Sequence, residues 1–163
     1  MYERRLDLAL AETESCFLWG ARQTGKSTLL HQRFPEAHYY DLLKSDEYRR
    51  LLDDPSILRQ EVLARRDSPH SRSLVIIDEV QKIPELLDEA HWLMENCGTR
   101  FILCGSSARK LRRGHANLLG GRAIRYELLP LTAGEIPEFD LLRALNHGLL
   151  PRIYDSPHAH RLL

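Results

Sequence analysis

Two glycines, a lysine and a serine near the start of the chain have the spacing of a phosphate-binding loop. Residues 20–28 read GARQTGKST and match the pattern G-x-x-x-x-G-K-S/T at every fixed position. The apolar run 16–19 precedes the loop, and residues 29–34 continue without a helix breaker up to Pro35. A strand, a tight turn and a helix in this order direct backbone N–H groups and the positive helix end at phosphate oxygens. The stretch therefore predicts a nucleotide phosphate site.

Each residue type in the loop has an expected task. Gly20 and Gly25 permit the turn, Lys26 can reach the β- and γ-phosphates, and the Ser27 hydroxyl can ligate Mg²⁺. Thr28 is expected to be a helix residue near the loop. We expect nucleotide binding by the whole loop, that is by Gly20, Ala21, Arg22, Gln23, Thr24, Gly25, Lys26, Ser27 and Thr28.

A second stretch with chemical potential is 73–79, SLVIIDE. A continuous apolar run is typical of a strand buried on both faces of a parallel sheet, and two acids follow it. This resembles a Walker B strand, in which Asp78 would hold Mg²⁺ and Glu79 would polarise the attacking water. The alternative is that Asp78 caps the helix that follows. The distance along the chain from Lys26 leaves room for one intervening strand and helix.

Polar groups also follow the apolar strand predicted at 100–104. Ser106 or Ser107 would face the same edge of the sheet as Asp78, because ligands of open α/β sheets bind at the carboxyl ends of strands. A helix N-cap is the alternative for both serines. The basic residues of 109–113 (RKLRR) are either a solvated face or a contact for anions, namely nucleotide phosphates across a subunit boundary or nucleic acid.

The remaining elements are predicted from periodicity and breakers. We expect helices over 2–14, 45–52, 54–66 and 84–97, and strands over 37–42 and 122–128. Together with the strands at 16–19, 73–79 and 100–104, these indicate an α/β fold with alternating strands and helices.

Composition excludes several classes of protein. With 43% hydrophobic and 28% charged residues the chain has the balance of a globular domain, and the 23 basic and 23 acidic residues leave no overall field for nucleic acid or anionic membranes. No apolar run reaches the length of a membrane span or a signal peptide, so we expect a cytoplasmic protein without membrane contact. The three cysteines lack metal-site spacing and are expected to be reduced.

These motifs together resemble a prokaryotic AAA-like P-loop ATPase of a group that carries a further C-terminal domain. The resemblance covers most of residues 1–136 and rests on 20–28, 76–82 (IIDEVQK), 104–111 (CGSSARKL) and 117–122 (NLLGGR) leading into 129–132. It implies a three-layer α/β/α P-loop NTPase sandwich with a five-stranded, mainly parallel sheet. It also implies a sensor role for Ser106 or Ser107 and γ-phosphate sensing by Arg122, acting in its own subunit or a neighbouring one. The implied catalytic set is Lys26, Glu79, Ser106 and Arg122.

The resemblance divides the chain into an ATPase domain at 1–136 and, at 137–163, a linker with the incomplete start of a second domain. His158 and His160 lack a third metal ligand nearby and are expected in a solvated tail.

The leading functional hypothesis is hydrolysis of ATP with Mg²⁺ to drive a conformational change in a partner or in the second domain. The alternative is an ATP-binding regulatory switch with little turnover by itself, which could associate with nucleic acid. Self-association or a protein partner is compatible with either. A small-molecule kinase is disfavoured, because a carboxylate that activates water would waste ATP beside an acceptor substrate.

Overall fold

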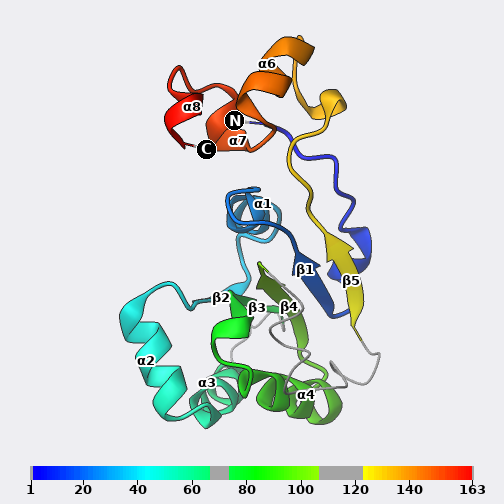
Figure 1. Cartoon of the computed structure of the whole chain (residues 1–163). Helices are drawn as coiled ribbons and strands as arrows, with labels where there is room; N and C mark the ends of the chain where they lie inside the picture. The colour runs from blue at the N-terminus through cyan, green and yellow to red at the C-terminus, as the bar shows by residue number, and fades with distance from the viewer. Residues whose placement is uncertain (1, 67–73, 107–122, 163) are drawn as a thin grey trace.

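Five parallel strands form one sheet at the centre of the chain (Figure 1). The computed structural model describes residues 2–66, 74–106 and 123–162. The strand order is β2-β3-β4-β1-β5, and every pairing in it is parallel. The strands are β1 (Cys16–Trp19), β2 (His38–Asp41), β3 (Leu74–Asp78), β4 (Arg100–Gly105) and β5 (Ile124–Glu127). The five predicted strands are therefore confirmed.

Helices cover both faces of the sheet because parallel strands need crossover connections. They are α1 (Lys26–Arg33), α2 (Ser45–Asp53), α3 (Ser56–Arg66) and α4 (Leu86–Cys97). Alternate strand residues point to opposite faces, so Phe17 packs with α3 and α4 whereas its neighbour Leu18 packs with Leu30 of α1. Two separate cores result, and the predicted three-layer α/β/α sandwich is confirmed. Within it Cys16 and Cys104 are buried, and all three cysteines are free.

The N-terminal segment differs from its prediction. Only a short 3₁₀ turn, η1 (Ala9–Glu12), forms in place of the helix expected over 2–14. Residues 2–8 form neither helix nor strand, and the backbone N–H of Arg5 donates to the Glu135 carboxylate at 2.8 Å. The Arg4 side chain also donates from Nε to Glu135 Oε1 at 3.0 Å, so one carboxylate binds two consecutive residues of this segment. A partner distant in sequence therefore overrides the local helical pattern.

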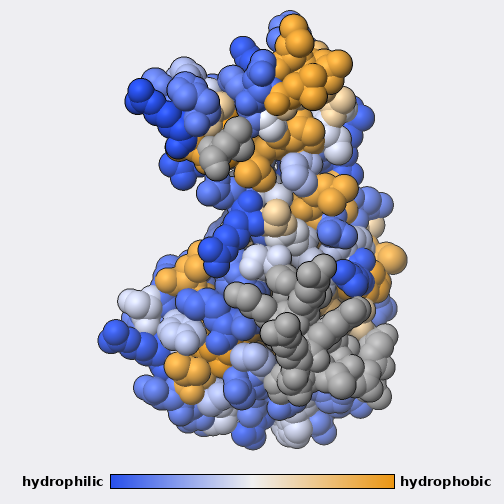
Figure 2. Space-filling model, in the orientation of Figure 1, coloured by the Kyte–Doolittle hydropathy of each residue, from blue (hydrophilic) through white to orange (hydrophobic). Residues whose placement is uncertain are grey.

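After β5 the chain continues to a group of short helices beyond the carboxyl edge of the sheet (Figure 1). These elements are η4 (Ala133–Glu135), α6 (Leu141–His147), α7 (Pro151–Tyr154) and α8 (Ala159–Leu162). Leu131, Ile136 and Tyr154 form a small core there, with Tyr2 from the other end of the chain against it. Figure 2 shows an apolar surface over α6, where Leu141, Leu142 and Leu145 are exposed.

In the part of the chain that the structure describes, no helix combines the length and the apolar character that crossing a membrane requires.

Candidate active site

The turn between β1 and α1 depends on its two glycines for different reasons. A Cβ at Gly20 would overlap with the carbonyl oxygen of Leu128, so the close approach of the segment after β5 requires glycine there. Gly25 is the residue immediately before α1 and has φ = 90°, a left-handed conformation that other residues adopt only with strain. A residue larger than glycine would therefore overlap with a neighbour at position 20 and be strained at position 25.

Lys26 lies inside this turn with only 5% of its surface exposed. Its Nζ donates to the carbonyl oxygens of Gly20 and Ala21, both at 2.8 Å, and Thr24 Oγ1 also donates to Ala21 O at 2.9 Å. No carboxylate of residues 2–66, 74–106 or 123–162 forms an ion pair with Lys26. The buried ammonium is thus held by neutral dipoles alone among these residues.

Asp78, at the carboxyl end of β3, is the buried anion of the site, with 2% exposure. Its Oδ2 accepts hydrogen bonds from Ser27 Oγ at 2.5 Å and from the Tyr39 hydroxyl at 2.6 Å, and its Oδ1 accepts from the Glu79 N–H at 3.0 Å. Burial, with the hydrogen bond and charge of Asp78, raises the pKa of Tyr39. Asp78 does not cap the turn that follows, since the cap position is Glu79, which lacks a side-chain capping bond.

Glu79 and Ser106 meet through a residue that the motifs did not single out, Gln81 of the short turn η2 (Val80–Lys82). The Gln81 Nε2 donates to Glu79 Oε2 and also to Ser106 Oγ at 3.2 Å. Glu79 has φ = 59°, in the left-handed region. The side chains at the ends of β3 and β4 are therefore linked at one edge of the sheet.

Of the predicted site residues, Lys26, Ser27, Asp78, Glu79 and Ser106 gather at the carboxyl edge of the sheet. Ala21, Arg22, Gln23 and Thr28 are exposed, and Thr28 belongs to α1 as expected. Ser107, Arg122 and the basic stretch 109–113 lie outside the described residues.

A buried arginine that sequence reasoning missed supports the loop from its other side. Arg4 Nη1 donates to the Thr24 carbonyl at 2.5 Å, Nη2 donates to Leu129 O at 2.7 Å, and Nε pairs with Glu135 Oε1 at 3.0 Å. Burial favours the neutral form of Glu135, but hydrogen bonds from the Arg5 and Thr132 backbone and from Arg4 outweigh it and lower the pKa to about 2. No local signal marks Arg4, because its partners are distant in sequence.

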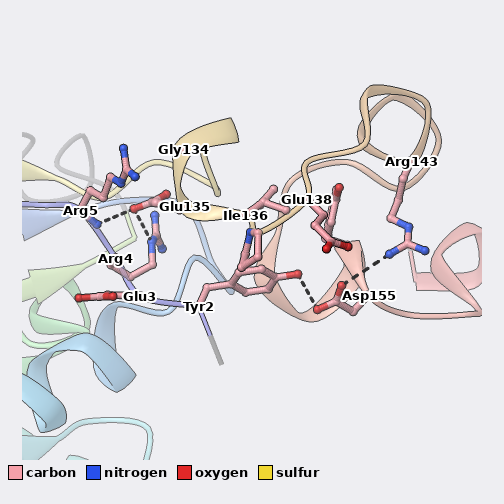
Figure 3. Close-up of a pocket in the computed structure, with 12 residues that line it drawn as sticks. Tyr2, Glu3, Arg4, Arg5, Gly134, Glu135, Ile136, Glu138, Arg143 and Asp155 are labelled. Atoms are coloured by element: carbon pink, nitrogen blue, oxygen red, sulfur yellow. Dashed lines mark hydrogen bonds and ion pairs between the residues drawn. The ribbon is translucent and has the colours of Figure 1, made fainter.

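A pocket of about 950 Å³ adjoins this arginine, between the N-terminal segment and the elements after β5 (Figure 3). Arg4, Arg5, Glu135 and Asp155 help to line it, whereas Lys26, Asp78 and Glu79 do not. Its size therefore does not identify the chemical centre, which is better located by the buried charges.

The oxygen atoms of Ser27 and Asp78 are of the kind that Mg²⁺ prefers, and these two side chains lie in direct contact. No cluster of three or more His, Cys, Asp or Glu side chains suited to a metal occurs among the residues described. A metal held by Ser27 and Asp78 would therefore need further oxygen ligands, which nucleotide phosphates and water supply.

Comparison with known proteins matches residues 12–137 to a family model described as an AAA domain. No curated protein matches. Among solved structures, the ORC2 protein of Aeropyrum pernix, in ADPNP-ADP complexes, has a TM-score of 0.50 at 17% sequence identity. The match covers 76% of this chain and 43% of the ORC2 chain. The Walker-type ATPase PABY2304 of Pyrococcus abyssi has a TM-score of 0.48 at 18% sequence identity, and the match covers 74% of this chain and 50% of the PABY2304 chain. PCH-2 of C. elegans has a TM-score of 0.48 at 15% sequence identity, and the match covers 80% of this chain and 39% of the PCH-2 chain. The chain thus spans half or less of these proteins.

Proposed function

Since the chain belongs to the AAA domain family, we propose that it binds ATP with Mg²⁺ and hydrolyses it. The observation that carries this proposal is the state of two buried charges. Lys26 and Asp78 lie at the same edge of the sheet, yet each is hydrogen-bonded to neutral groups.

Burying a charge against neutral dipoles is less favourable than burying it against an opposite charge. A ligand that presents an anion to Lys26 and a cation to Asp78 would satisfy both at once. A metal-bound polyphosphate has this combination of charges. The phosphate loop adds backbone N–H groups and the N-terminal end of α1, which favour negative charge.

In this proposal Ser27 and Asp78 hold Mg²⁺, which neutralises charge that develops on the phosphates. The hydrogen bond between Ser27 and Asp78 keeps both oxygens together and ready for that role. Lys26 binds the phosphates, and Gly20 to Thr28 form the loop around them. Glu79 accepts the proton of the attacking water, and Ser106 contacts the γ-phosphate or this water.

Replacing Glu79 by glutamine tests hydrolysis directly. Glu79→Gln removes the base but keeps the size of the side chain, so ATP affinity should stay within about twofold while turnover falls by about 10²-fold or more. Glu85→Gln, an exposed glutamate nearby, is the matched control. Both turnover of purified protein and binding of a fluorescent ATP analogue should be measured. Equal turnover of the wild type and Glu79→Gln would exclude Glu79 as the base, and a wild type that binds ATP without turnover would favour the regulatory switch.

Arg122 is proposed to stabilise the γ-phosphoryl charge in the transition state, a role commonly worth about 10³- to 10⁵-fold in rate. If it acts from a neighbouring subunit, activity per chain should rise with protein concentration, and mixing Arg122→Ala with Glu79→Gln should restore activity. If it acts within its own subunit, mixing should restore nothing. An Arg122→Ala chain with wild-type turnover under all conditions would remove Arg122 from the mechanism.

We further propose that turnover drives a conformational change in a protein partner or in a second domain that begins at 137–163. The contacts of Arg4 support coupling between the nucleotide site and the C-terminal helices, because Arg4 contacts both the phosphate loop and the segment that leads to these helices. The basic stretch 109–113 is the proposed contact for nucleic acid, should that be the partner. A cytoplasmic location, where ATP is abundant, belongs to the same proposal.

A further inference from the structure

We propose that Gln81 is a positioning residue that holds the Glu79 carboxylate beside Ser106, in the orientation needed to act on water. The inference rests on the proposed hydrolysis of ATP and adds a residue to it. Gln81 donates from one nitrogen, Nε2, to both Glu79 Oε2 and Ser106 Oγ.

The orientation of the Gln81 amide follows from the chemistry of its neighbours. A carboxylate only accepts hydrogen bonds, so the NH₂ end of the amide must face Glu79. In that orientation Gln81 Oε1 is buried and has no hydrogen-bond partner among residues 2–66, 74–106 and 123–162. A buried carbonyl without a donor is unfavourable, but the reversed amide would place its oxygen against the Glu79 carboxylate. The contact with Glu79 thus determines the orientation of the Gln81 amide, although Oε1 then faces no donor among the described residues.

The surrounding structure provides the space that this amide occupies. A Cβ at Gly105, the last residue of β4, would overlap with Gln81 Oε1 and lie 2.8 Å from Trp19 Cζ3. Gly105 does not have a left-handed backbone, so its absent side chain matters for space rather than for conformation. The amide of Gln81 therefore lies directly against the end of β4, the strand that leads into Ser106.

The backbone of Gln81 is fixed from both sides. Val80, the first residue of η2, and Ile83, the residue after it, are fully buried in the hydrophobic core. Lys82 Nζ donates to the Leu42 carbonyl at 2.5 Å and lies 4.2 Å from the centre of the Tyr48 ring. Gln81 consequently has a stable base from which to direct a neighbouring side chain, as positioning requires.

The position of β4 explains why a contact toward Ser106 is productive. In the sheet β4 lies between β3, which carries Asp78, and β1, which leads into the phosphate loop. Gln81 therefore holds the Glu79 carboxylate toward Ser106 at the end of β4, the strand that lies next to β1 and its phosphate loop. An unrestrained Glu79 would sample other rotamers, and a misplaced base acts poorly on water.

Replacing Gln81 by methionine tests the inference, because methionine keeps the length of the side chain without its N–H donor. For Gln81→Met we expect kcat to fall by about tenfold or more, with KM within about twofold of the wild type. The melting temperature should not fall, since the unpaired carbonyl is removed along with the donor. Gln81→Glu should lower kcat further, because two carboxylates repel. Gln60→Met, on the exposed face of α3, is the matched control and should leave every value unchanged.

A double-variant cycle separates positioning from a general structural role. If Gln81 acts through Glu79, Gln81→Met should cause no further loss of turnover in a Glu79→Gln chain. A spectroscopic readout accompanies this: the Gln81 side-chain amide signals in NMR, identified by their absence in Gln81→Met, should shift in Glu79→Gln and not in Glu85→Gln.

The outcomes distinguish this inference from the proposed function. A wild type that hydrolyses ATP no faster than Gln81→Met overturns the role of Gln81 and leaves hydrolysis intact. The role of Gln81 is also overturned if Gln81→Met lowers turnover by the same factor in the wild-type and the Glu79→Gln chain. A wild type without any turnover contradicts the proposed hydrolysis itself, and the role of Gln81 in turnover with it.

Discussion

Two pairs of buried, opposite charges border the phosphate loop, and they are arranged differently. Arg4 and Glu135 meet directly, with Nε and Oε1 3.0 Å apart and side chains that are 7% and 4% exposed. Lys26 and Asp78 are also buried, yet Lys26 is bonded to carbonyl oxygens and Asp78 to two hydroxyls and an N–H. One pair is complete within the fold, whereas the other keeps its charges apart.

The difference indicates which charges serve the fold and which serve a ligand. Breaking a complete buried ion pair leaves one charge without compensation and strongly destabilises a protein. A buried cation whose partners are only neutral dipoles gains more from a bound anion. We therefore expect stability to depend on Arg4 and Glu135, and nucleotide binding to depend on Lys26 and Asp78.

The largest effect is expected at Lys26, on the ligand side of this contrast. Lys26→Met should lower ATP affinity by about a thousandfold, to below detection in most assays, because it removes the buried charge that we propose binds the phosphates. Its stability should stay within about 1 kcal/mol of the wild type. Titration with a fluorescent ATP analogue and thermal unfolding measure the two quantities, with exposed Lys44→Met as the control. Equal affinity in the variant and the wild type would contradict the assignment.

Arg4 should show the reverse behaviour. Arg4→Met leaves Glu135 buried without its cation, so the free energy of unfolding should fall by about 3 kcal/mol. Arg33→Met is a matched control, because the Arg33–Glu12 pair has side chains 53% and 58% exposed and should contribute less than about 1 kcal/mol. Chemical denaturation measures both. If Arg4→Met were as stable as Arg33→Met but lost ATP binding, the division between fold and ligand would be wrong.

Acid should remove the contribution of the complete pair. The folded-state pKa of Glu135 is about 2, below its ordinary value of 4.5, so its contribution is present above pH 4.5 and is lost as the pH falls toward 2. Glu135→Gln should therefore lose stability less steeply over this interval than the wild type. Unfolding by urea at several pH values compares the two slopes. If the stability of the two proteins fell in parallel with pH, Glu135 would not be the residue whose protonation causes the loss.

The smallest effect is expected at Tyr39. Tyr39→Phe removes one donor to Asp78, and we expect a change in stability of about 1 kcal/mol or less. At the proposed metal site the hydroxyl would compete with Mg²⁺ for Asp78 Oδ2, so the variant should need equal or lower Mg²⁺ for half-maximal turnover. Partly buried Tyr2 donates to Asp155 Oδ2 at 2.5 Å, away from the proposed metal site, and Tyr2→Phe is the control. A higher Mg²⁺ requirement in Tyr39→Phe would show that the hydroxyl assists metal binding instead.

The strands and the phosphate loop could be predicted because their signals are local. Continuous apolar runs mark β1, β3 and β4, and the loop is defined by two glycines and a lysine within seven residues of sequence. Asp78, Glu79 and Ser106 follow from the same logic, since residues at the carboxyl ends of neighbouring parallel strands share one edge.

Arg4, Tyr39 and Gln81 could not be predicted because their roles arise from contacts between elements. Arg4 and Glu135 are 131 residues apart, and Tyr39 and Asp78 are 39 apart. Each is of a residue type that is common on surfaces or in cores, so nothing in the sequence distinguishes it. The helix predicted over residues 2–14 was wrong for the same reason, because the contacts of Arg4 and Arg5 with Glu135 outweigh local preference.

The place of Arg4 in the chain limits where the protein can be shortened. The match to the AAA domain begins at residue 12, which suggests a natural starting point for a minimal domain. A chain cut there would retain the whole phosphate loop but lose the guanidinium that joins Thr24, Leu129 and Glu135. Glu135 would then be a buried acid without a cation, favouring protonation or local unfolding of the segment after β5. The first residues of the chain thus belong to the minimal folding unit, although the family match begins after them.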